Sequence, residues 1–317
     1  MKIRDLDPER DLPAAVDITR AVSPAAVVTV ESLRRRYEAT PERAGLQALV
    51  AVVDERVVGR GNASLDLFTE ERRLVIELGV LPAARGRGVG SALYDALLAH
   101  AAASTPARVA THFEHNEPGV RFATKRGFVE VRAETISALD PRLVREELPD
   151  RVDVRPVSAV DPRTVYEVAI VATRDAPYAA TIVDLPYEEW SALVFENPLF
   201  TPEGSFVAYA DGEPAAVSLL VADPASGRGT TMFTGTLPAF RGRGLARAAK
   251  LALLRWGAAS GLGQVVTVND DRNEPMLALN RRLGYRPFGR RVEYEAGFAG
   301  VSRAGTASPR GLPAPAT

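Results

Sequence analysis

Residues 81–90 read LPAARGRGVG, and residues 237–246 read LPAFRGRGLA. The second stretch follows the first by 156 residues. Two further matches are each separated by 157 residues. In these, Asn116-Glu117-Pro118 returns as Asn273-Glu274-Pro275, and Gly127-Phe128 returns as Gly284-Tyr285. Three ordered matches at nearly constant spacing indicate that one domain occurs twice in the chain.

The chain has 317 residues, of which 46% are hydrophobic, which is enough for two compact cores. We expect an N-terminal domain over 1–145 and a C-terminal domain over 152–300. The boundary falls in a charged stretch, DPRLVREELPDRVD, that shows little apolar alternation. Residues 301–317 are rich in Pro, Ala, Gly and Ser, and we expect a disordered tail there.

The composition disfavours several classes of function. Lys and Arg number 39 against 40 Asp and Glu, so the net charge of -1 provides no global field for nucleic acid or a membrane. The sequence has no cysteine, which excludes disulfides, thiolate metal sites and a cysteine nucleophile. It also lacks an apolar run of the ~18 residues that a membrane span needs. We expect a cytoplasmic monomer or homodimer that binds neither nucleic acid nor membrane.

Apolar periodicity predicts the same order of elements in each half. The first half is expected to contain helices over 14–22 and 30–37, a hairpin over 46–68, a strand over 74–81, a helix over 89–101, a strand over 108–113, a helix over 118–125 and a last extended pair over 128–138. The second half repeats the hairpin over 205–221, then the strand, helix, strand and helix over 230–237, 245–259, 264–268 and 275–282. This order predicts an α/β (α+β) fold, in which each domain is a mostly antiparallel mixed sheet flanked by helices.

In both copies a strand is followed by Arg-Gly-Arg-Gly and then at once by a helix. Such a junction suits phosphate, because unpaired N–H groups at a helix N-terminus point outward and glycine lets a ligand approach the backbone. The pattern is not a P-loop, which needs Gly-Lys-Ser or Gly-Lys-Thr. Nor is it the dinucleotide pattern G-x-G-x-x-G, because Gly86, Gly88 and Gly90 are spaced G-x-G-x-G. The alternative is a glycine-rich helix start with solvated arginines.

Both loops resemble the Q/R-x-x-G-x-G/A motif of the GNAT superfamily of N-acetyltransferases, which holds the pyrophosphate of acetyl-CoA. The run from Asn273 to Tyr285 resembles the family's next segment, which packs beside the pantetheine arm. The resemblance covers nearly all of residues 1–300, so the chain is identified as a tandem GNAT protein. It implies acetyl-CoA as cosubstrate without a metal, bound by Val80, Arg85, Gly86, Arg87, Gly88, Val89, Gly90, Thr236, Arg241, Gly242, Arg243, Gly244, Leu245, Ala246 and Asn273.

The resemblance also implies direct attack of an amine on the thioester, with no acyl-enzyme. The amine must lose a proton first, since a free alkyl amine has a pKa of about 10.4. Glu77 is the candidate general base, acting directly or through water; the alternative is a solvent-facing strand residue. Phe233 stands at the matching position of the second copy. Backbone N–H groups of residues 76–80 or 233–236 are expected to bind the thioester oxygen.

Many relatives place a tyrosine five residues before the aromatic residue of the Leu-Gly-aromatic turn, where it protonates the departing thiolate. Here Ala123 and Asn280 occupy those positions. Asn280 is a candidate catalytic residue that can donate a hydrogen bond but not a proton; the alternative is a capping or surface role. Together with Asn269 and Asn273, it slightly favours the second half for turnover, although both loops are expected to bind CoA. His112 and His115 are interpreted as surface residues rather than metal ligands.

The sequence therefore predicts an acetyl-CoA-dependent N-acetyltransferase that acts on a primary amine. The acceptor can be a small molecule or a peptide, and polyamines, aminoglycoside-like compounds, amino acids, protein N-termini and cysteine-linked sugars all stay open. The alternative function is a non-catalytic acyl-CoA-binding sensor or scaffold, which the two absent tyrosines suggest. An ATP-dependent enzyme is disfavoured because no acidic metal-binding motif accompanies the glycine loops.

Overall fold

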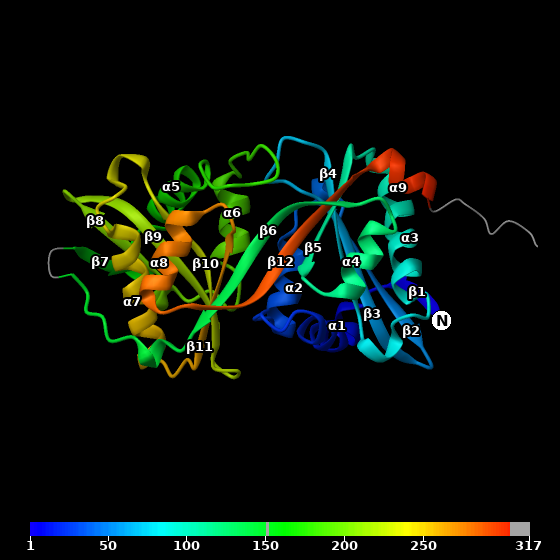
Figure 1. The fold of residues 1–317 in the computed structure, drawn as a ribbon, viewed down its shortest axis with the longest axis horizontal. Helices are drawn as coiled ribbons and strands as arrows, with labels where there is room; N and C mark the ends of the chain where they lie inside the picture. Colours follow the sequence, from blue (N-terminus) through cyan, green and yellow to red (C-terminus); the bar gives the residue numbers. More distant parts are fainter. Residues whose placement is uncertain (150–151, 305–317) are drawn as a thin grey trace, which may run out of the picture.

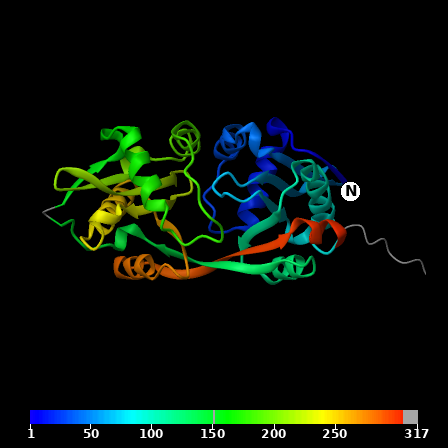
Figure 2. The ribbon, with the colours of Figure 1, turned by 90° about the horizontal axis from the view of Figure 1, so that it is seen from above.

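A computed structural model describes residues 1–149 and 152–304. Their strands form one continuous twelve-stranded sheet, in the order β1-β2-β3-β4-β5-β12-β6-β11-β10-β9-β8-β7. The two halves of the chain lie side by side, and each half has helices on both faces of its part of the sheet (Figures 1 and 2). The predicted fold class, a mostly antiparallel mixed sheet flanked by helices and built from two repeats, is confirmed.

The first half follows the predicted order closely. Its elements are β1 (Lys2–Asp5), α1 (Pro8–Val22), α2 (Val30–Ala39), β2 (Gln47–Val53), β3 (Arg56–Leu65), β4 (Arg73–Val80), α3 (Val89–Ala101), β5 (Arg108–Glu114), α4 (Glu117–Thr124) and β6 (Val129–Leu139). Asp54 and Glu55 form the two-residue hairpin turn with positive φ angles of 46° and 61°. Thr29 caps α2, since its side chain accepts a hydrogen bond from the N–H of Ser32.

The second half repeats this order. Its elements are β7 (Asp153–Pro156), α5 (Pro162–Thr173), α6 (Tyr187–Val194), β8 (Phe206–Ala210), β9 (Glu213–Asp223), β10 (Arg228–Thr236), α7 (Leu245–Ala259), β11 (Gln264–Asp270), α8 (Glu274–Leu283), β12 (Arg286–Gly297) and α9 (Phe298–Ala304). Helix α9 continues to Ala304, so the expected disordered tail is wrong for residues 301–304. Residues 305–317 of that tail lie outside the described residues.

Helix α1 begins six residues before the predicted start. Asp7 caps it by accepting hydrogen bonds from the N–H groups of Glu9 and Arg10, and Pro8 occupies the first helical position. The predicted start at residue 14 directly follows Pro13, a residue that usually breaks a helix. Pro13 lies inside the helix, at its sixth residue, where its missing N–H leaves the carbonyl of Glu9 without its usual intrahelical donor.

Strands β6 and β12 are exchanged between the halves. The predicted extended pair over 128–138 is wrong, because these residues form the single strand β6, which leaves its own half and pairs with β11. Strand β12 crosses in the opposite direction and pairs with β5. The two crossing strands also pair antiparallel with each other, from Arg286 opposite Ala138 to Glu295 opposite Val129. In Figure 1 they form the long diagonal ribbon that joins the halves.

Each half contains one parallel strand pair that separates early. β4 pairs with β5 only from Arg73 opposite Arg108 to Val75 opposite Ala110. β10 pairs with β11 only from Arg228 opposite Gln264 to Thr231 opposite Thr267. Beyond these residues the strands diverge, so the sheet opens at the end of each strand that leads into a glycine loop.

A buried ion cluster fixes the exchanged strand β12 to the first half. Arg73 on β4 is 5% exposed, and its Nε lies 2.6 Å from Oε1 of Glu295 on β12. The same guanidinium contacts Glu293 on β12 and lies 3.0 Å from an oxygen of Asp66. Arg132 on β6 also reaches Glu293, at 2.7 Å. Because these charges are buried, each depends on its partners for compensation.

We predict that Arg73→Met lowers the free energy of unfolding by about 3–5 kcal/mol, because it leaves Glu293 and Glu295 buried with less compensating charge. Urea denaturation of the full chain measures this. The control is Arg121→Met, which removes an exposed ion pair with Glu117 and should change stability by about 0.5 kcal/mol or less. Equal effects of the two substitutions would contradict a stabilising role for the cluster.

Candidate active site

A cavity of about 1080 Å³ lies between the two halves. Helix α2 contributes Arg36 to its wall and helix α6 contributes Trp190 from the other half. Figure 2 shows these helices on the same side of the sheet, above the crossing strands β6 and β12. The cavity also reaches the glycine loop at Gly88 and the start of α3 at Val89. Both halves therefore enclose one space.

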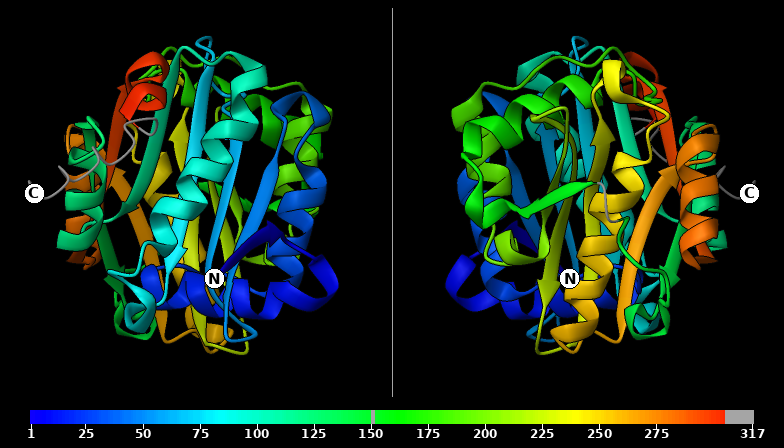
Figure 3. Two further views of the ribbon diagram at one scale, coloured as in Figure 1. Left: turned by 90° about the vertical axis from the view of Figure 1, so that its right-hand side faces the viewer. Right: turned by 90° about the vertical axis from the view of Figure 1, so that its left-hand side faces the viewer.

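The cavity extends to both faces of the sheet where β4 and β5 separate. Side chains alternate along a strand, so Ile76 and Leu78 on β4 pack into the core beneath α3. Glu77 points to the opposite face, beside Arg60 of β3 and Arg36 of α2. All of these residues line the cavity. A molecule in the opening between β4 and β5 would thus contact different chemistry on each face. Figure 3 shows α1 and α2 on one side of the sheet and α3 on the other.

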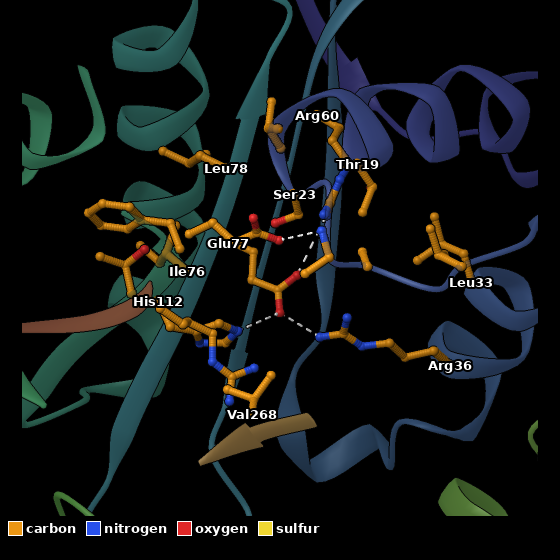
Figure 4. A pocket seen from close by; sticks show the side chains of 18 of the residues that line it. Thr19, Ser23, Leu33, Arg36, Arg60, Ile76, Glu77, Leu78, His112 and Val268 are labelled. Atoms are coloured by element: carbon orange, nitrogen blue, oxygen red, sulfur yellow. Dashed lines mark hydrogen bonds and ion pairs between the residues drawn. The ribbon is translucent and has the colours of Figure 1, made fainter. Parts of the chain in front are cut away.

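Glu77 is buried and bound by three positively charged or protonatable groups (Figure 4). Its Oε1 lies 2.6 Å from Arg36 and 3.5 Å from Nε2 of His112, and its Oε2 lies 3.6 Å from Arg60. Burial raises the pKa of Glu77, but Arg36, His112 and Arg60 together outweigh it and hold that pKa well below its usual range. Glu77 is therefore ionised throughout the neutral pH range.

His112 is a functional candidate that the sequence interpretation missed. It was expected on the surface, but its half-exposed side chain lines the cavity and faces Glu77. His112 shares a face of β5 with Glu114, whose carboxylate accepts the N–H of Ala25 just beyond α1. Because Glu77 and His112 are far apart in the sequence and on strands that separate, only the fold brings them together. His115, by contrast, is exposed as expected.

The first glycine loop opens into the cavity. Gly86 and Gly88 have positive φ angles of 75° and 80°, and an added Cβ at either would meet no atom within 4 Å. Arg85 donates from Nε to the carbonyl of Val80 at 3.1 Å. Among the described residues, neither Arg85 nor the exposed Arg87 forms an ion pair with a carboxylate. Both guanidiniums are therefore available to an anionic ligand.

The second glycine loop has the same backbone but different surroundings. Gly242 and Gly244 have φ angles of 77° and 78°, and Arg241 donates to the carbonyl of Thr236 at 3.3 Å. Arg241 also pairs with Asp175 at 2.8 Å, and Arg243 binds Asp211 at 2.7 Å. The described residues that line the large cavity include none from 241–246. This loop has its arginines already paired.

Asn280 takes part in a closed polar network in the second half. It is 2% exposed; its Oδ1 accepts from Nζ of Lys250 at 2.6 Å, and its Nδ2 donates to Oδ1 of Asn269 at 2.6 Å. Lys250 is fully buried on α7 and also lies 3.3 Å from Thr267. The expected alternative of a surface or capping residue is wrong for Asn280, since it is buried and its side chain bonds to the buried Lys250 and the partly buried Asn269.

The remaining residues that were predicted to bind the cosubstrate lie at equivalent places in the two halves, around each glycine loop and the helices that follow it. Asn273 caps α8, because its Oδ1 accepts from the N–H of Met276 at 3.3 Å. Leu245, the first residue of α7, is 4% exposed and packs against β8 and β9, whereas Ala246 is partly exposed beside it. Val80, Val89 and Gly90 line the large cavity. Most of the predicted residues of the first half line that cavity, and they share it with the ionised carboxylate of Glu77. The predicted residues of the second half are not among the described residues that line it.

Stability should depend on pH through Lys250, because burial lowers its pKa to about 7 from an ordinary value near 10.4. Between these values the unfolded chain binds a proton that the folded protein does not, so this lysine makes folding more favourable as pH rises from 7 to 10. We predict that Lys250→Met is more stable than the natural chain by roughly 2 kcal/mol at pH 7, after the loss of the Asn280 hydrogen bond is subtracted.

That gain should disappear as pH approaches 10, because the unfolded lysine then begins to lose its own proton and the pH-dependent cost of burying Lys250 becomes small. Denaturant titrations at several pH values measure the difference. The exposed Lys125→Met is the control, and its difference from the natural chain should not vary with pH. A gain that stays constant up to pH 10 would contradict the assignment of the effect to Lys250 protonation.

Residues 16–128 and 169–285 each match the Acetyltransferase (GNAT) family. The two matched segments together span more than half of the chain, and they coincide with the two structural repeats. The chain therefore belongs to the GNAT family of acetyltransferases, with two GNAT repeats in tandem, and it is an acetyltransferase. Among the described residues, no helix has both the length and the apolar character that crossing a membrane requires.

Curated relatives resemble the chain over most of its length. Mycothiol acetyltransferase from Amycolatopsis mediterranei is 32% identical over 266 residues, which cover 79% of this chain and 84% of that protein. Mycothiol acetyltransferase from Acidothermus cellulolyticus is 27% identical over 283 residues, which cover 80% of each protein.

Solved structures share the fold at lower identity. A tandem GNAT protein from the clavulanic acid biosynthesis pathway matches with a TM-score of 0.73 and 20% identity, over 94% of this chain and 98% of that chain. A GCN5-related N-acetyltransferase from Sphaerobacter thermophilus matches with a TM-score of 0.72 and 20% identity, over 94% and 95%. At this identity the likeness concerns the fold alone.

Proposed function

We propose that this acetyltransferase uses acetyl-CoA, that its first half binds the cosubstrate, and that a small-molecule primary amine enters the cavity between the halves. One observation carries the proposal. The first glycine loop, the opening between β4 and β5, and the Glu77–His112 pair all line the same cavity.

The first loop provides what a pyrophosphate needs. Its two αL glycines keep the backbone open, and helix α3 begins directly behind Gly88 with no side-chain cap on its N–H groups. Arg85 and Arg87 add charge that no carboxylate of the described residues neutralises. The cosubstrate supplies a thioester, and the opening beyond Val75 leads from the loop toward Glu77.

We assign proton removal from the amine to His112, oriented by Glu77. The pKa of Glu77 is held well below its usual range, so this carboxylate has little affinity for a proton from an amine. Imidazole is the side chain used most often for proton transfer near neutral pH. Glu77 faces His112 at 3.5 Å and would stabilise the imidazolium, while Arg36 and Arg60 hold the carboxylate in place.

The second half forms the acceptor wall. Trp190 on α6, Ile170 on α5 and Met232 on β10 face the cavity opposite α2. The relatives named mycothiol acetyltransferase support a small-molecule acceptor in place of a peptide. We infer that the second half has a supporting role, because Phe233 replaces the carboxylate and Lys250 fills the equivalent interior with its own polar network.

We predict that Gly88→Glu weakens acetyl-CoA binding at least ~100-fold, because a carboxylate would stand beside the phosphate site. Gly244→Glu is a matched control. The two glycines have φ angles of 80° and 78° and equally open surroundings, so backbone strain is the same in both variants. Calorimetric titration with acetyl-CoA gives affinity and stoichiometry. Loss of binding with Gly244→Glu, and not with Gly88→Glu, would place the cosubstrate in the second half.

We predict that His112→Asn lowers kcat by ~10²–10⁴-fold with little change in acetyl-CoA affinity, because it removes the proton acceptor. A steady-state assay that follows thiol release with a panel of primary amines measures this. His115→Asn, an exposed histidine three residues away, should leave kcat unchanged. A normal kcat in His112→Asn would instead support Glu77 as the base through a water molecule.

A further inference from the structure

The hydroxyl of Tyr94 is buried in the first half without a hydrogen bond to any described residue. Tyr94 lies on α3, is 3% exposed and lines the large cavity. Its ring packs edge-on against Phe122 and Phe128, with centroid distances of 5.9 and 6.3 Å. A buried polar group without a partner costs free energy, so an unpaired hydroxyl beside a ligand cavity points to a partner that arrives with the ligand.

The repeat shows which way the side chain at this position points. Lys250 on α7 occupies the place of Tyr94, and Asn280 on α8 occupies the place of Ala123. In the second half these two side chains touch, with Nζ of Lys250 2.6 Å from Oδ1 of Asn280. By the repeat, Tyr94 extends toward Ala123. Alanine has no polar atom to offer, so the first half keeps a free hydroxyl where the second half closes its network.

Tyr94 lies on the face of the sheet opposite to the proton acceptor. It belongs to the core beneath α3, together with Ile76 and Val80 of β4. Glu77 and His112 face the side of α1 and α2. A thioester in the opening between β4 and β5 would therefore have the amine on the Glu77 side. Its sulfur would lie on the side of α3, where the glycine loop begins.

We propose that the Tyr94 hydroxyl donates a hydrogen bond to the CoA sulfur as it leaves, which rests on the proposed function of the first half. In this step a C–N bond forms to the acetyl carbon and the C–S bond breaks. The sulfur takes the bonding electron pair as a thiolate. The amine proton passes to His112, and the thiolate later takes a proton from solvent, so Tyr94 is unchanged.

The relative acidity of the Tyr94 phenol and the CoA thiol decides whether Tyr94 donates a hydrogen bond to the sulfur or transfers its proton to it. Burial raises the pKa of Tyr94 to about 12, with a smaller opposing effect of Arg126. A thiol is a stronger acid than this phenol, since a cysteine thiol, for comparison, has a pKa of about 8.5. The proton therefore stays on the phenol oxygen. This differs from the role of the relatives' tyrosine, whose place Ala123 occupies.

Tyr94→Phe of the full chain tests the proposal, because it removes the hydroxyl and keeps the ring. We expect kcat to fall about 10- to 100-fold, the range for a hydrogen bond to a charged atom. The affinity for acetyl-CoA should change by less than about threefold. Binding of CoA at about pH 9.5, where a much larger fraction of the free thiol is ionised than at pH 7, should weaken about tenfold or more. Calorimetry measures both affinities without turnover.

Two further measurements separate this role from packing. The variant should unfold with an unchanged or higher free energy, because an unpaired buried hydroxyl is removed. Tyr285→Phe is the matched control, since it removes another buried tyrosine hydroxyl, in the second half and outside the cavity lining, and it should leave kcat unchanged. A Tyr94→Phe variant with normal kcat and normal CoA affinity at pH 9.5 would overturn the proposal.

Failure of the proposed function would give a different result. If the natural chain binds no acetyl-CoA and transfers no acetyl group, the proposed function fails before Tyr94 is tested. If the natural chain is active and both Gly88→Glu and His112→Asn impair it while Tyr94→Phe does not, the proposed function stands. In that case only the role of Tyr94 is wrong.

Discussion

The exchange of β6 and β12 is the constraint on which the rest of the structure depends. Each half lends its last strand to the other, so the sheet continues without a break from β1 to β7. β12 carries Glu293 and Glu295, whose buried carboxylates pair with Arg73 of β4, and Glu293 also pairs with Arg132 of β6. Since the halves share both backbone hydrogen bonds and buried charge, their relative position is fixed, and the cavity between them has a defined shape.

In this continuous sheet, β4 and β5 stop pairing after Val75 and Ala110, and the opening that results has a different chemical environment on each face. One face of the opening holds an ionised carboxylate and an imidazole, and the other face holds aromatic side chains and an unpaired hydroxyl. Alternation of side chains along β4 is sufficient to produce this division. Attack on a thioester needs a proton acceptor on one side of the carbonyl carbon and stabilisation of the leaving group on the other, and the two faces match that requirement.

The two repeats show how one backbone supports different roles. Both glycine loops have nearly identical φ angles and both contain two arginines. In the second loop, Asp175 and Asp211 already bind the guanidiniums, and the interior behind it is filled by Lys250 and Asn280. Substituted side chains, with the backbone unchanged, thus leave the arginines of the first loop without a carboxylate partner among the described residues and pair those of the second loop with carboxylates.

The sequence alone determined the duplication, the order of the elements and the identity of the family, because glycine loops, caps and apolar periodicity are local signals. It indicated Glu77 and both loops for the same reason. Only the tertiary structure decided the exchange of β6 and β12, since pairing partners in a sheet are not encoded in the pattern of one strand. It alone brought His112 to Glu77 and exposed Tyr94 to the cavity, because those contacts join residues whose local sequence carries no sign of the partner.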